Sequence, residues 1–313
     1  MQPQPQEISA QPMSVERAFE VLNAQPEFRI LRKLDPQALF KEPQSGSSNV
    51  GKACILDTET TGRDYTKDRI IELGFVTFEY DRETGAFLRA VDKFNELEDP
   101  GMPIPSEASK VNGISDEMVQ GKRIDDDKVQ SLLADVDLVI AHNAEFDRKF
   151  VEPRFGDLFV HKAWGCSRRQ VDWEAQGIGS AKLDYIAFQN GFFYDAHRAV
   201  NDCLATLHML TLPRDDDRTS LQELLEKARQ KSYHIWAVDS PFGAKDLLKL
   251  RGYRWNPGTD PDSPIKAWHI VVNEEQLVPE QDWLLHEVYG SSSRHQPLVR
   301  TIDALTRFSA REG

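Results

Sequence analysis

The chain has 313 residues, of which 40% are hydrophobic and 28% charged, and this balance is ordinary for a globular protein with one large domain or two smaller ones. Its 38 basic and 51 acidic residues give a net charge of −13. Proteins that bind duplex DNA through charge are basic, so this net charge excludes a protein that coats DNA by electrostatics alone. It does not exclude an enzyme that holds nucleotides through divalent cations, because such an enzyme needs carboxylates.

The first 51 residues are predicted to form an N-terminal extension and linker, residues 1–51. Residues 1–12 are rich in proline and glutamine and are expected to be disordered. Ser14 is a good N-cap for the short helix predicted after it, and Phe28-Arg-Ile-Leu-Arg-Lys-Leu favours a short strand. Residues 43–51 contain serine and glycine in the proportion typical of a linker.

Residues 52–212 show the alternation of strands and helices that indicates an α/β domain. Short apolar runs predict strands over residues 53–56, 70–78, 87–94 and 138–141, with the first three forming a meander. Helical spacing of apolar residues predicts helices over residues 126–135, 144–152, 182–190 and 198–211.

A second unit is predicted over residues 213–313. Pro213 and the acidic run Asp215-Asp216-Asp217 mark its start. It holds four of the six tryptophans, Trp236, Trp255, Trp268 and Trp283. We expect a small α+β unit with helices over 219–231, 242–250 and 274–288 and strands over 233–238, near 253 and over 267–272. The last 20 residues are expected to be mobile.

Asp57 and Glu59 end the first predicted strand of the α/β domain. Residues i and i+2 of a strand point to the same face, so the two carboxylates can converge on one spot. Such hard oxygen ligands suit Mg²⁺ or Mn²⁺. For this pair alone, a polar strand end without a ligand is the alternative interpretation.

Three further residues have positions that suit a site. Asp147 follows the fourth predicted strand, at the edge where ligands of α/β sheets bind, although it could also lie on a solvated helix face beside Arg148 or Lys149. His197 and Asp202 are five residues apart and would not share a helix face, so His197 is expected in the loop or first turn before the helix of Asp202. A neutral histidine there could act as a general base, and a surface histidine is the alternative.

The acidic residues fall into three motifs: Asp57-Thr-Glu59-Thr-Thr-Gly, Ala141-His-Asn-Ala-Glu-Phe-Asp147 and His197-Arg-Ala-x-x-Asp202. In order and spacing these resemble the exonuclease motifs of the DEDDh 3′→5′ exonucleases, the family of the proofreading epsilon subunit of the bacterial replicative polymerase and of ribonuclease T type enzymes. The resemblance covers about residues 52–212 and continues in Arg69-Ile-Ile-Glu-Leu-Gly and Val111-Asn-Gly-Ile. It implies an α/β, ribonuclease H-like fold, with a mixed five-stranded sheet flanked by helices.

The resemblance also implies a mechanism and a set of site residues. Two Mg²⁺ or Mn²⁺ ions would be held by four carboxylates, with His197 taking a proton from the attacking water: Asp57, Glu59, Asp147 and Asp202. The terminal nucleotide would be held by the backbone near Thr58 and Thr60 and by the side chains of Ile114, Asn143 and Phe146. Phe146 also has the spacing to pack against Phe150 as a core residue. Asn112 departs from the pattern of many members, and we expect it to affect substrate fit more than the metal site.

The stretch from Pro241 to Pro257 mixes aromatic and basic residues: Phe242, Lys245, Lys249, Arg251, Tyr253, Arg254 and Trp255. Exposed aromatic side chains stack on bases and nearby cations bind phosphates, so the stretch favours an accessory module that binds single strands. A tryptophan core with a basic rim is the alternative interpretation.

The sequence therefore predicts a two-metal 3′→5′ exonuclease that releases 5′-mononucleotides from the free 3′ ends of single-stranded nucleic acid, with DNA favoured, in DNA repair or proofreading. A polymerase or another replication or repair protein is the candidate partner. An exoribonuclease that trims RNA 3′ ends and a non-catalytic nucleic-acid-binding or interaction protein remain alternatives. A phosphatase with an aspartyl-phosphate intermediate fits poorly, because its motif needs aspartate where Glu59 stands.

Three scattered cysteines are too few for a disulfide framework. No apolar run approaches the roughly 18 residues of a membrane span, and the first residues do not resemble a signal peptide. We therefore expect a cytoplasmic protein without membrane contacts.

Overall fold

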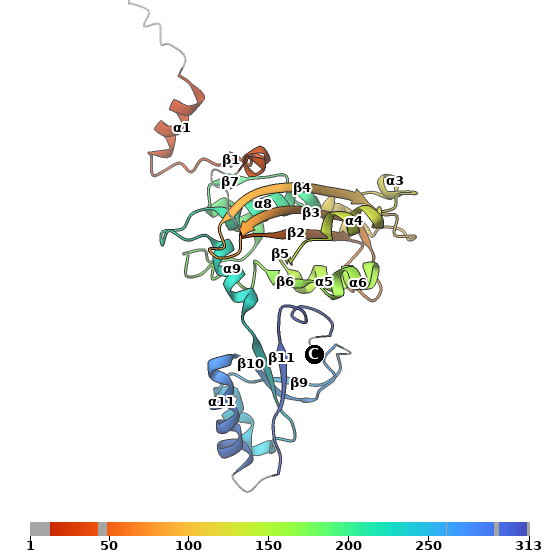
Figure 1. Ribbon diagram of the computed structural model, residues 1–313, viewed down its shortest axis with the longest axis vertical. Helices are drawn as coiled ribbons and strands as arrows, with labels where there is room; N and C mark the ends of the chain where they lie inside the picture. The colour runs from red at the N-terminus through yellow and green to blue at the C-terminus, as the bar shows by residue number, and fades with distance from the viewer. Residues whose placement is uncertain (1–12, 43–48, 261, 291–293, 312–313) are drawn as a thin grey trace, which may run out of the picture.

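A computed structural model describes residues 13–42, 49–260, 262–290 and 294–311. A larger unit is built on a five-stranded sheet, and a smaller unit on a four-stranded sheet lies below it in Figure 1. The disorder predicted for residues 1–12 concerns a segment outside the described residues. None of the described helices is long and apolar enough to cross a membrane.

The five-stranded sheet has the order β4-β3-β2-β5-β6. Its strands are β2 (Val50–Thr60), β3 (Ile70–Asp81), β4 (Phe87–Leu97), β5 (Leu138–Ala141) and β6 (Ala163–Cys166). Strands β2, β3 and β4 pair antiparallel, whereas β5 runs parallel to β2 and β6 parallel to β5. The mixed five-stranded sheet and its three-stranded meander are thus confirmed.

Both faces of this sheet are covered by helices. Ala53 and Ile55 of β2 join the core on one face, and Cys54 and Leu56 join the core on the other, as the alternation of side chains along a strand requires. The first face packs against α7 (Leu183–Gln189), α8 (Ala199–Thr211) and α9 (Ser220–Arg229). The second packs against α4 (Asp126–Leu133), α5 (Ala144–Phe155) and α6 (Asp157–Val160). Two short helices, α2 (Ser106–Asn112) and α3 (Asp116–Val119), follow β4.

The N-terminal extension begins with α1 (Val15–Asn23), which has no buried residue and projects from the molecule in Figure 1. β1 (Arg32–Lys33) pairs in parallel with β7 (Phe192–Phe193). The short helix η1 (Pro36–Phe40) places Leu39 in the core of the larger unit. The helix and the short strand predicted before residue 43 are therefore present, with the strand shorter than expected.

The smaller unit contains an antiparallel sheet of order β11-β8-β10-β9. Its strands are β8 (Ser232–Ala237), β9 (Arg254–Asn256), β10 (Ala267–Asn273) and β11 (Leu298–Ile302). Its helices are η2 (Phe242–Ala244), α10 (Lys245–Leu250), α11 (Glu274–Trp283) and the π-helical turn η3 (Leu284–Tyr289). The predicted α+β character is confirmed, and β11 is an additional strand that the sequence did not indicate.

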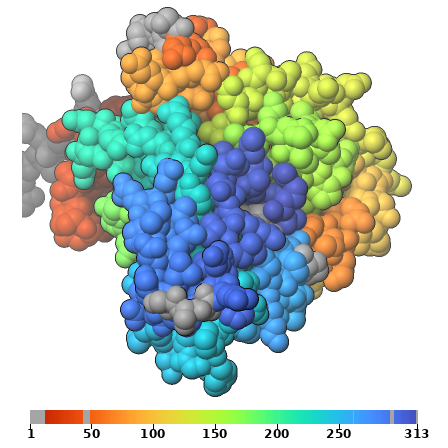
Figure 2. Space-filling model, turned by 60° about the horizontal axis from the view of Figure 1, so that its bottom comes forward, coloured from red at the N-terminus to blue at the C-terminus, as the bar shows by residue number. Residues whose placement is uncertain are grey.

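Packing crosses the boundary predicted at residue 213. Leu221 and Leu224 of α9 belong to the core of the larger unit. The segment after β11, which we call the tail (residues 303–311), returns to that unit, where the backbone N–H of Trp164 donates to the carbonyl of Ala304 at 2.7 Å and Phe308 is buried. In Figure 2 the dark blue tail lies against the yellow-green residues of α5 and α6. The expectation that the last 20 residues are mobile is wrong for the tail, because its side chains complete a core.

Candidate active site

Three carboxylates meet at the carboxyl end of β2. Oxygen atoms of Asp57, Glu59 and Asp202 lie within 4.8 Å of one another. Asp57 and Glu59 share a face of β2, as the i, i+2 spacing predicts, and α8 packs on that face and carries Asp202. The structure therefore brings together three of the four acids that the sequence singled out.

The fourth acid, Asp147, comes from α5 on the opposite face of the sheet and is 2% exposed. One of its oxygens accepts hydrogen bonds from the backbone N–H of Thr58 at 3.0 Å and from the Thr58 hydroxyl at 2.9 Å. Asp147 is also close enough to Asp57 to raise the pKa of that carboxyl. Thr58 thus fixes Asp147 against the strand that carries the other two acids.

Burial and mutual repulsion hold the pKa values of these acids high. Burial, followed by the charges of Asp147 and Asp202, raises the pKa of Asp57 well above its usual range. Burial and the charge of Asp202 raise the pKa of Glu59 to about 8, and burial raises that of Asp147 to about 7. A carboxylate cluster of this kind is costly when charged unless a cation lies among the oxygens. The donor set, all oxygen, fits Mg²⁺ or Mn²⁺.

The start of α8 is anchored by Glu72, a fully buried acid of β3. Its carboxylate accepts from the guanidinium of Arg198 at 2.6 Å and from the backbone N–H of Ala199 at 3.0 Å. Gly74 lets the helix approach the strand, because a Cβ there would lie 2.4 Å from the backbone nitrogen of Val200. Sequence reasoning gave Glu72 no role, although a single acid in an apolar strand was the available signal.

Two more residues, Tyr194 and Asn112, contact the acids, and the sequence had indicated neither contact. The hydroxyl of Tyr194 donates to one oxygen of Asp202 at 2.8 Å. The side chain of Asn112 hydrogen-bonds Glu59 and counteracts the rise in its pKa. Asn112 thus contacts one of the candidate ligands, and the expectation that it affects substrate fit more than the metal site stays a prediction.

His197 lies in the loop immediately before α8, with an exposed side chain and a left-handed backbone (φ 63°). A non-glycine residue in this region is uncommon, and such conformations cluster at functional sites. Burial raises the pKa of Asp202, and the charge of His197 and a hydrogen bond from its backbone offset part of that rise. The loop position is the one expected for a base that approaches the acids from outside the helix.

The residues predicted to hold a nucleotide have different surroundings. Thr58 and Thr60 are buried in β2, and Ile114 is fully buried beside Ile71 and Val119, so its side chain offers no exposed surface. Asn143 and Phe146 line a hollow of about 640 Å³, together with Arg63, Tyr65 and Lys149. Phe146 is half-buried and also packs against Phe150 with ring centroids 4.9 Å apart, so it both lines the hollow and contacts the core.

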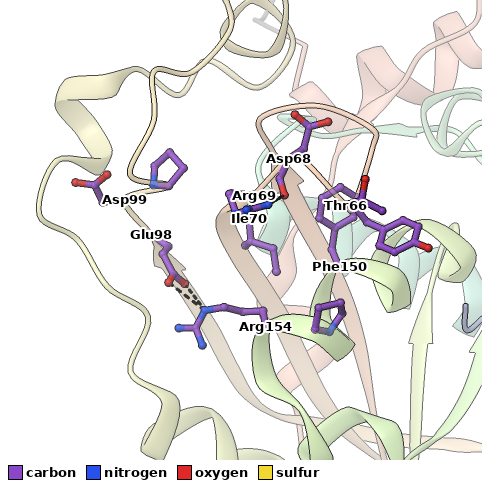
Figure 3. Close-up of a pocket in the computed structure, with 11 residues that line it drawn as sticks. Thr66, Asp68, Arg69, Ile70, Glu98, Asp99, Phe150 and Arg154 are labelled. Atoms are coloured by element: carbon purple, nitrogen blue, oxygen red, sulfur yellow. Dashed lines mark hydrogen bonds and ion pairs between the residues drawn. The ribbon is translucent and has the colours of Figure 1, made fainter.

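A neighbouring hollow of about 610 Å³ contains none of the residues of the three motifs (Figure 3). Three acids lie on its walls: Asp68, Glu98 and Asp99. The guanidinium of Arg154 points to the carboxylate of Glu98, 3.0 Å away, so this cation is already paired. Charge does not separate the two hollows, because the one that contains Asn143 is also lined by acids: Asp64, Glu145, Asp260 and Asp262. What distinguishes it is the presence of Asn143 and Phe146 from the second motif.

The motif histidine His142 has a structural role. Its Nε2 donates to the carbonyl of Ala181 and its Nδ1 accepts from the Ser167 hydroxyl, both at 2.8 Å. Burial lowers its pKa to about 4, so the ring is neutral and both nitrogens are engaged. This leaves His197 as the histidine of the three motifs that is available as a base.

A sequence profile of the exonuclease family RNase T matches residues 54–210, half of the chain. The chain belongs to this exonuclease family. The DNA polymerase III epsilon subunit of Treponema pallidum is 34% identical over 168 residues, covering 50% of this chain and 73% of the relative. The PolC-type DNA polymerase III of Thermotoga maritima is 26% identical over 271 residues, covering 77% of this chain and 18% of the relative. This exonuclease chain thus spans less than a fifth of the PolC-type relatives that it matches.

Two solved structures are similar to parts of this chain. Exonuclease X in complex with 5′ overhanging duplex DNA is 22% identical, with 54% of this chain and 99% of that chain covered and a TM-score of 0.38. Escherichia coli exonuclease I in complex with a dA16 oligonucleotide is 14% identical, with 74% of this chain and 67% of that chain covered and a TM-score of 0.46. The resemblance to the epsilon subunit and the ribonuclease T type enzymes that the motifs indicate is confirmed by the family profile and the relatives.

We expect the metal-free protein to lose stability as the pH rises from about 5 to 8. The pKa values of Glu59 and Asp147 are about 8 and about 7, against ordinary values of 4.5 and 3.8. Between these limits the folded chain keeps protons that the unfolded chain has released, so raising the pH removes part of its free energy of unfolding. Melting temperatures measured from about pH 5 to 8, in EDTA and in Mn²⁺, test this expectation. Mn²⁺ should reduce the fall in melting temperature with pH, and a metal-free melting temperature that rises with pH would contradict the expectation.

Proposed function

We propose that this protein is a divalent-metal-dependent 3′→5′ exonuclease that removes 5′-mononucleotides from single-stranded DNA ends, in proofreading or repair of bacterial DNA. The observation that carries the proposal is the convergence of Asp57, Glu59 and Asp202 within 4.8 Å, in a chain of the exonuclease family. DNA is favoured because the relatives reported above are named DNA polymerases. A replicative polymerase is the proposed partner, and such a role would place the protein in the cytoplasm.

Each residue of the site has a proposed task. Asp57, Glu59, Asp147 and Asp202 would hold two Mg²⁺ or Mn²⁺ ions, which supply positive charge beside the scissile phosphate and lower the pKa of water. His197 accepts the proton of the water that attacks the phosphorus, and the 3′ oxygen of the preceding nucleotide leaves. The exposed ring of His197 and its place beside Asp202 suit this transfer.

Substrate positioning falls to residues around the acids. The backbone of the Thr58–Thr60 stretch would contact the terminal nucleotide, and Asn143 and Phe146 would hold its sugar and base from the neighbouring hollow. The remaining predicted residue, Ile114, would reach the nucleotide only after a rearrangement of its buried cluster. Tyr194 and Glu72 position Asp202 and the start of α8, respectively.

Digestion of matched 5′-labelled DNA and RNA oligonucleotides, with Mg²⁺, Mn²⁺ or EDTA, tests the proposal. We expect a ladder that shortens from the 3′ end, depends on metal and is at least tenfold faster on DNA. Faster shortening of RNA would assign the enzyme to RNA 3′ ends instead. No shortening of either strand by the folded, metal-bound protein would leave a non-catalytic nucleic-acid-binding role.

A further inference from the structure

A third hollow, of about 490 Å³, lies on the smaller unit, outside the acidic cluster. It is lined mainly by three aromatic and two basic side chains: Phe242, Trp255, Trp268, Lys245 and Lys249. Phe242 is 90% exposed and Trp255 48% exposed, although both side chains are apolar. Apolar aromatic surface left open in a groove marks a binding site more often than isolated exposed residues do.

The backbone explains why these side chains face one another. Trp255 of β9 and Trp268 of β10 are direct partners across an antiparallel pair, with ring centroids 5.6 Å apart. Trp268 packs on the core of the smaller unit, so Trp255 is supported on one side and open on the other. Lys245 and Lys249 are four residues apart on α10 and therefore lie on the same side of that helix.

The charges of the hollow are opposite in sign to those of the chain. Both ionisable residues that line it are lysines, and among the described lining residues there is no carboxylate. The chain as a whole carries −13 and repels a polyanion. A strand of nucleic acid would find here two cations for its phosphates and open aromatic faces for its bases.

We propose that this hollow, which we call the Trp255 groove, binds a single-stranded segment of nucleic acid. Base stacking on aromatic side chains beside lysines is a sequence-tolerant way to hold a strand whose bases are unpaired. A duplex does not fit this chemistry, because its base faces are covered. Proline-rich peptides also dock on aromatic grooves, but they do not account for the two lysines. That the bound strand is the one cleaved at the acids rests on the proposed function.

Fluorescence anisotropy with 5′-fluorescein-labelled dT20, in EDTA so that no cleavage occurs, tests the groove on the full-length protein. Trp255→Ala should weaken binding about tenfold, since one stacked base contributes roughly 1–3 kcal/mol and 1.4 kcal/mol is tenfold. Trp255→Phe should keep most of the affinity. Lys245→Glu with Lys249→Glu should also weaken binding and reduce its dependence on salt.

Matched controls come from exposed residues that do not line the groove. Leu250 is 88% exposed on α10 and does not line the groove, so Leu250→Ala should leave binding unchanged. Lys231→Glu is the corresponding control for charge, because Lys231 is exposed and lies outside the groove. Circular dichroism and melting temperatures show whether each variant is folded. If Trp255→Ala is unfolded, the lysine variants provide the test.

The outcomes separate the groove from the active site. Unchanged dT20 affinity in the folded groove variants overturns the groove, whatever the enzyme cleaves. If the groove variants lose affinity for dT20 while the wild-type protein cleaves neither DNA nor RNA, the groove is supported and the proposed function is overturned. A proline-rich peptide that binds more tightly than dT20, and only when the groove is intact, assigns the groove to a protein partner and overturns the proposal.

Discussion

Replacing Asp202 with asparagine is expected to reduce the rate of 3′-end cleavage about 1,000-fold or more. Asp202 provides one of the three oxygens that lie within 4.8 Å of one another, and an amide in its place removes a negative charge from the candidate metal site. Cation chemistry at a phosphate contributes several kcal/mol to the transition state, and roughly 4 kcal/mol corresponds to about 1,000-fold. Single-turnover cleavage of a 5′-labelled strand measures the effect.

The same substitution is expected to leave the metal-free protein at least as stable as the wild type. Asparagine keeps an oxygen that can accept the hydrogen bond from the Tyr194 hydroxyl. It also removes one of the charges that raise the pKa values of Asp57 and Glu59. Loss of activity together with equal or higher melting temperature in EDTA, and with a smaller gain on adding Mn²⁺, identifies a ligand rather than a structural residue.

An exposed acid outside the cluster provides the control. Asp215→Asn makes the same chemical change in the acidic run after Pro213, where the side chain is exposed. It should cleave at the wild-type rate and respond to Mn²⁺ as the wild type does. If Asp202→Asn retained more than about a tenth of the activity, the carboxylate would not be a ligand that the reaction requires.

The site was largely predictable from local rules. Asp57 and Glu59 had to share a face because side chains alternate along a strand, and this holds whatever surrounds β2. His197 was expected outside the helix from its angular offset to Asp202, and α8 begins two residues after it. The five-stranded sheet followed from apolar runs and from the resemblance of the motifs.

The remaining contacts join residues that are far apart in the sequence, and no local pattern encodes them. Glu72 anchors Arg198 across 126 residues, and Asn112 reaches Glu59 from a helix whose placement depends on the fold. The tail was expected to be mobile. It is held instead by the burial of Phe308 and by backbone carbonyls that accept hydrogen bonds from a buried arginine of α5, a partner that the tail's own sequence does not reveal.

Deleting residues 303–313 is expected to lower the melting temperature by about 10 °C. Arg148 is fully buried and donates to the carbonyls of Leu305 at 2.6 Å and of Arg307 at 2.7 Å. Arg148 keeps its ion pair with Glu152 in the deleted chain, but each hydrogen bond to a charged group that is lost costs roughly 1.5–3 kcal/mol. Each kcal/mol shifts the melting temperature by about 2–4 °C in a domain of this size. Thermal melts of the deleted and full-length chains measure the loss.

Two substitutions in the full-length chain separate the core contact from the backbone contacts of the tail. Phe308 is 4% exposed in the core beside α5, so Phe308→Ala should cost roughly 3–5 kcal/mol. Leu305 is 48% exposed and uses its carbonyl, which Leu305→Ala keeps, so that variant should melt like the wild type. Because Asp147 precedes Arg148 on α5, the deletion should also weaken stabilisation by Mn²⁺. An unchanged melting temperature on deletion would mean that α5 holds Asp147 without the tail.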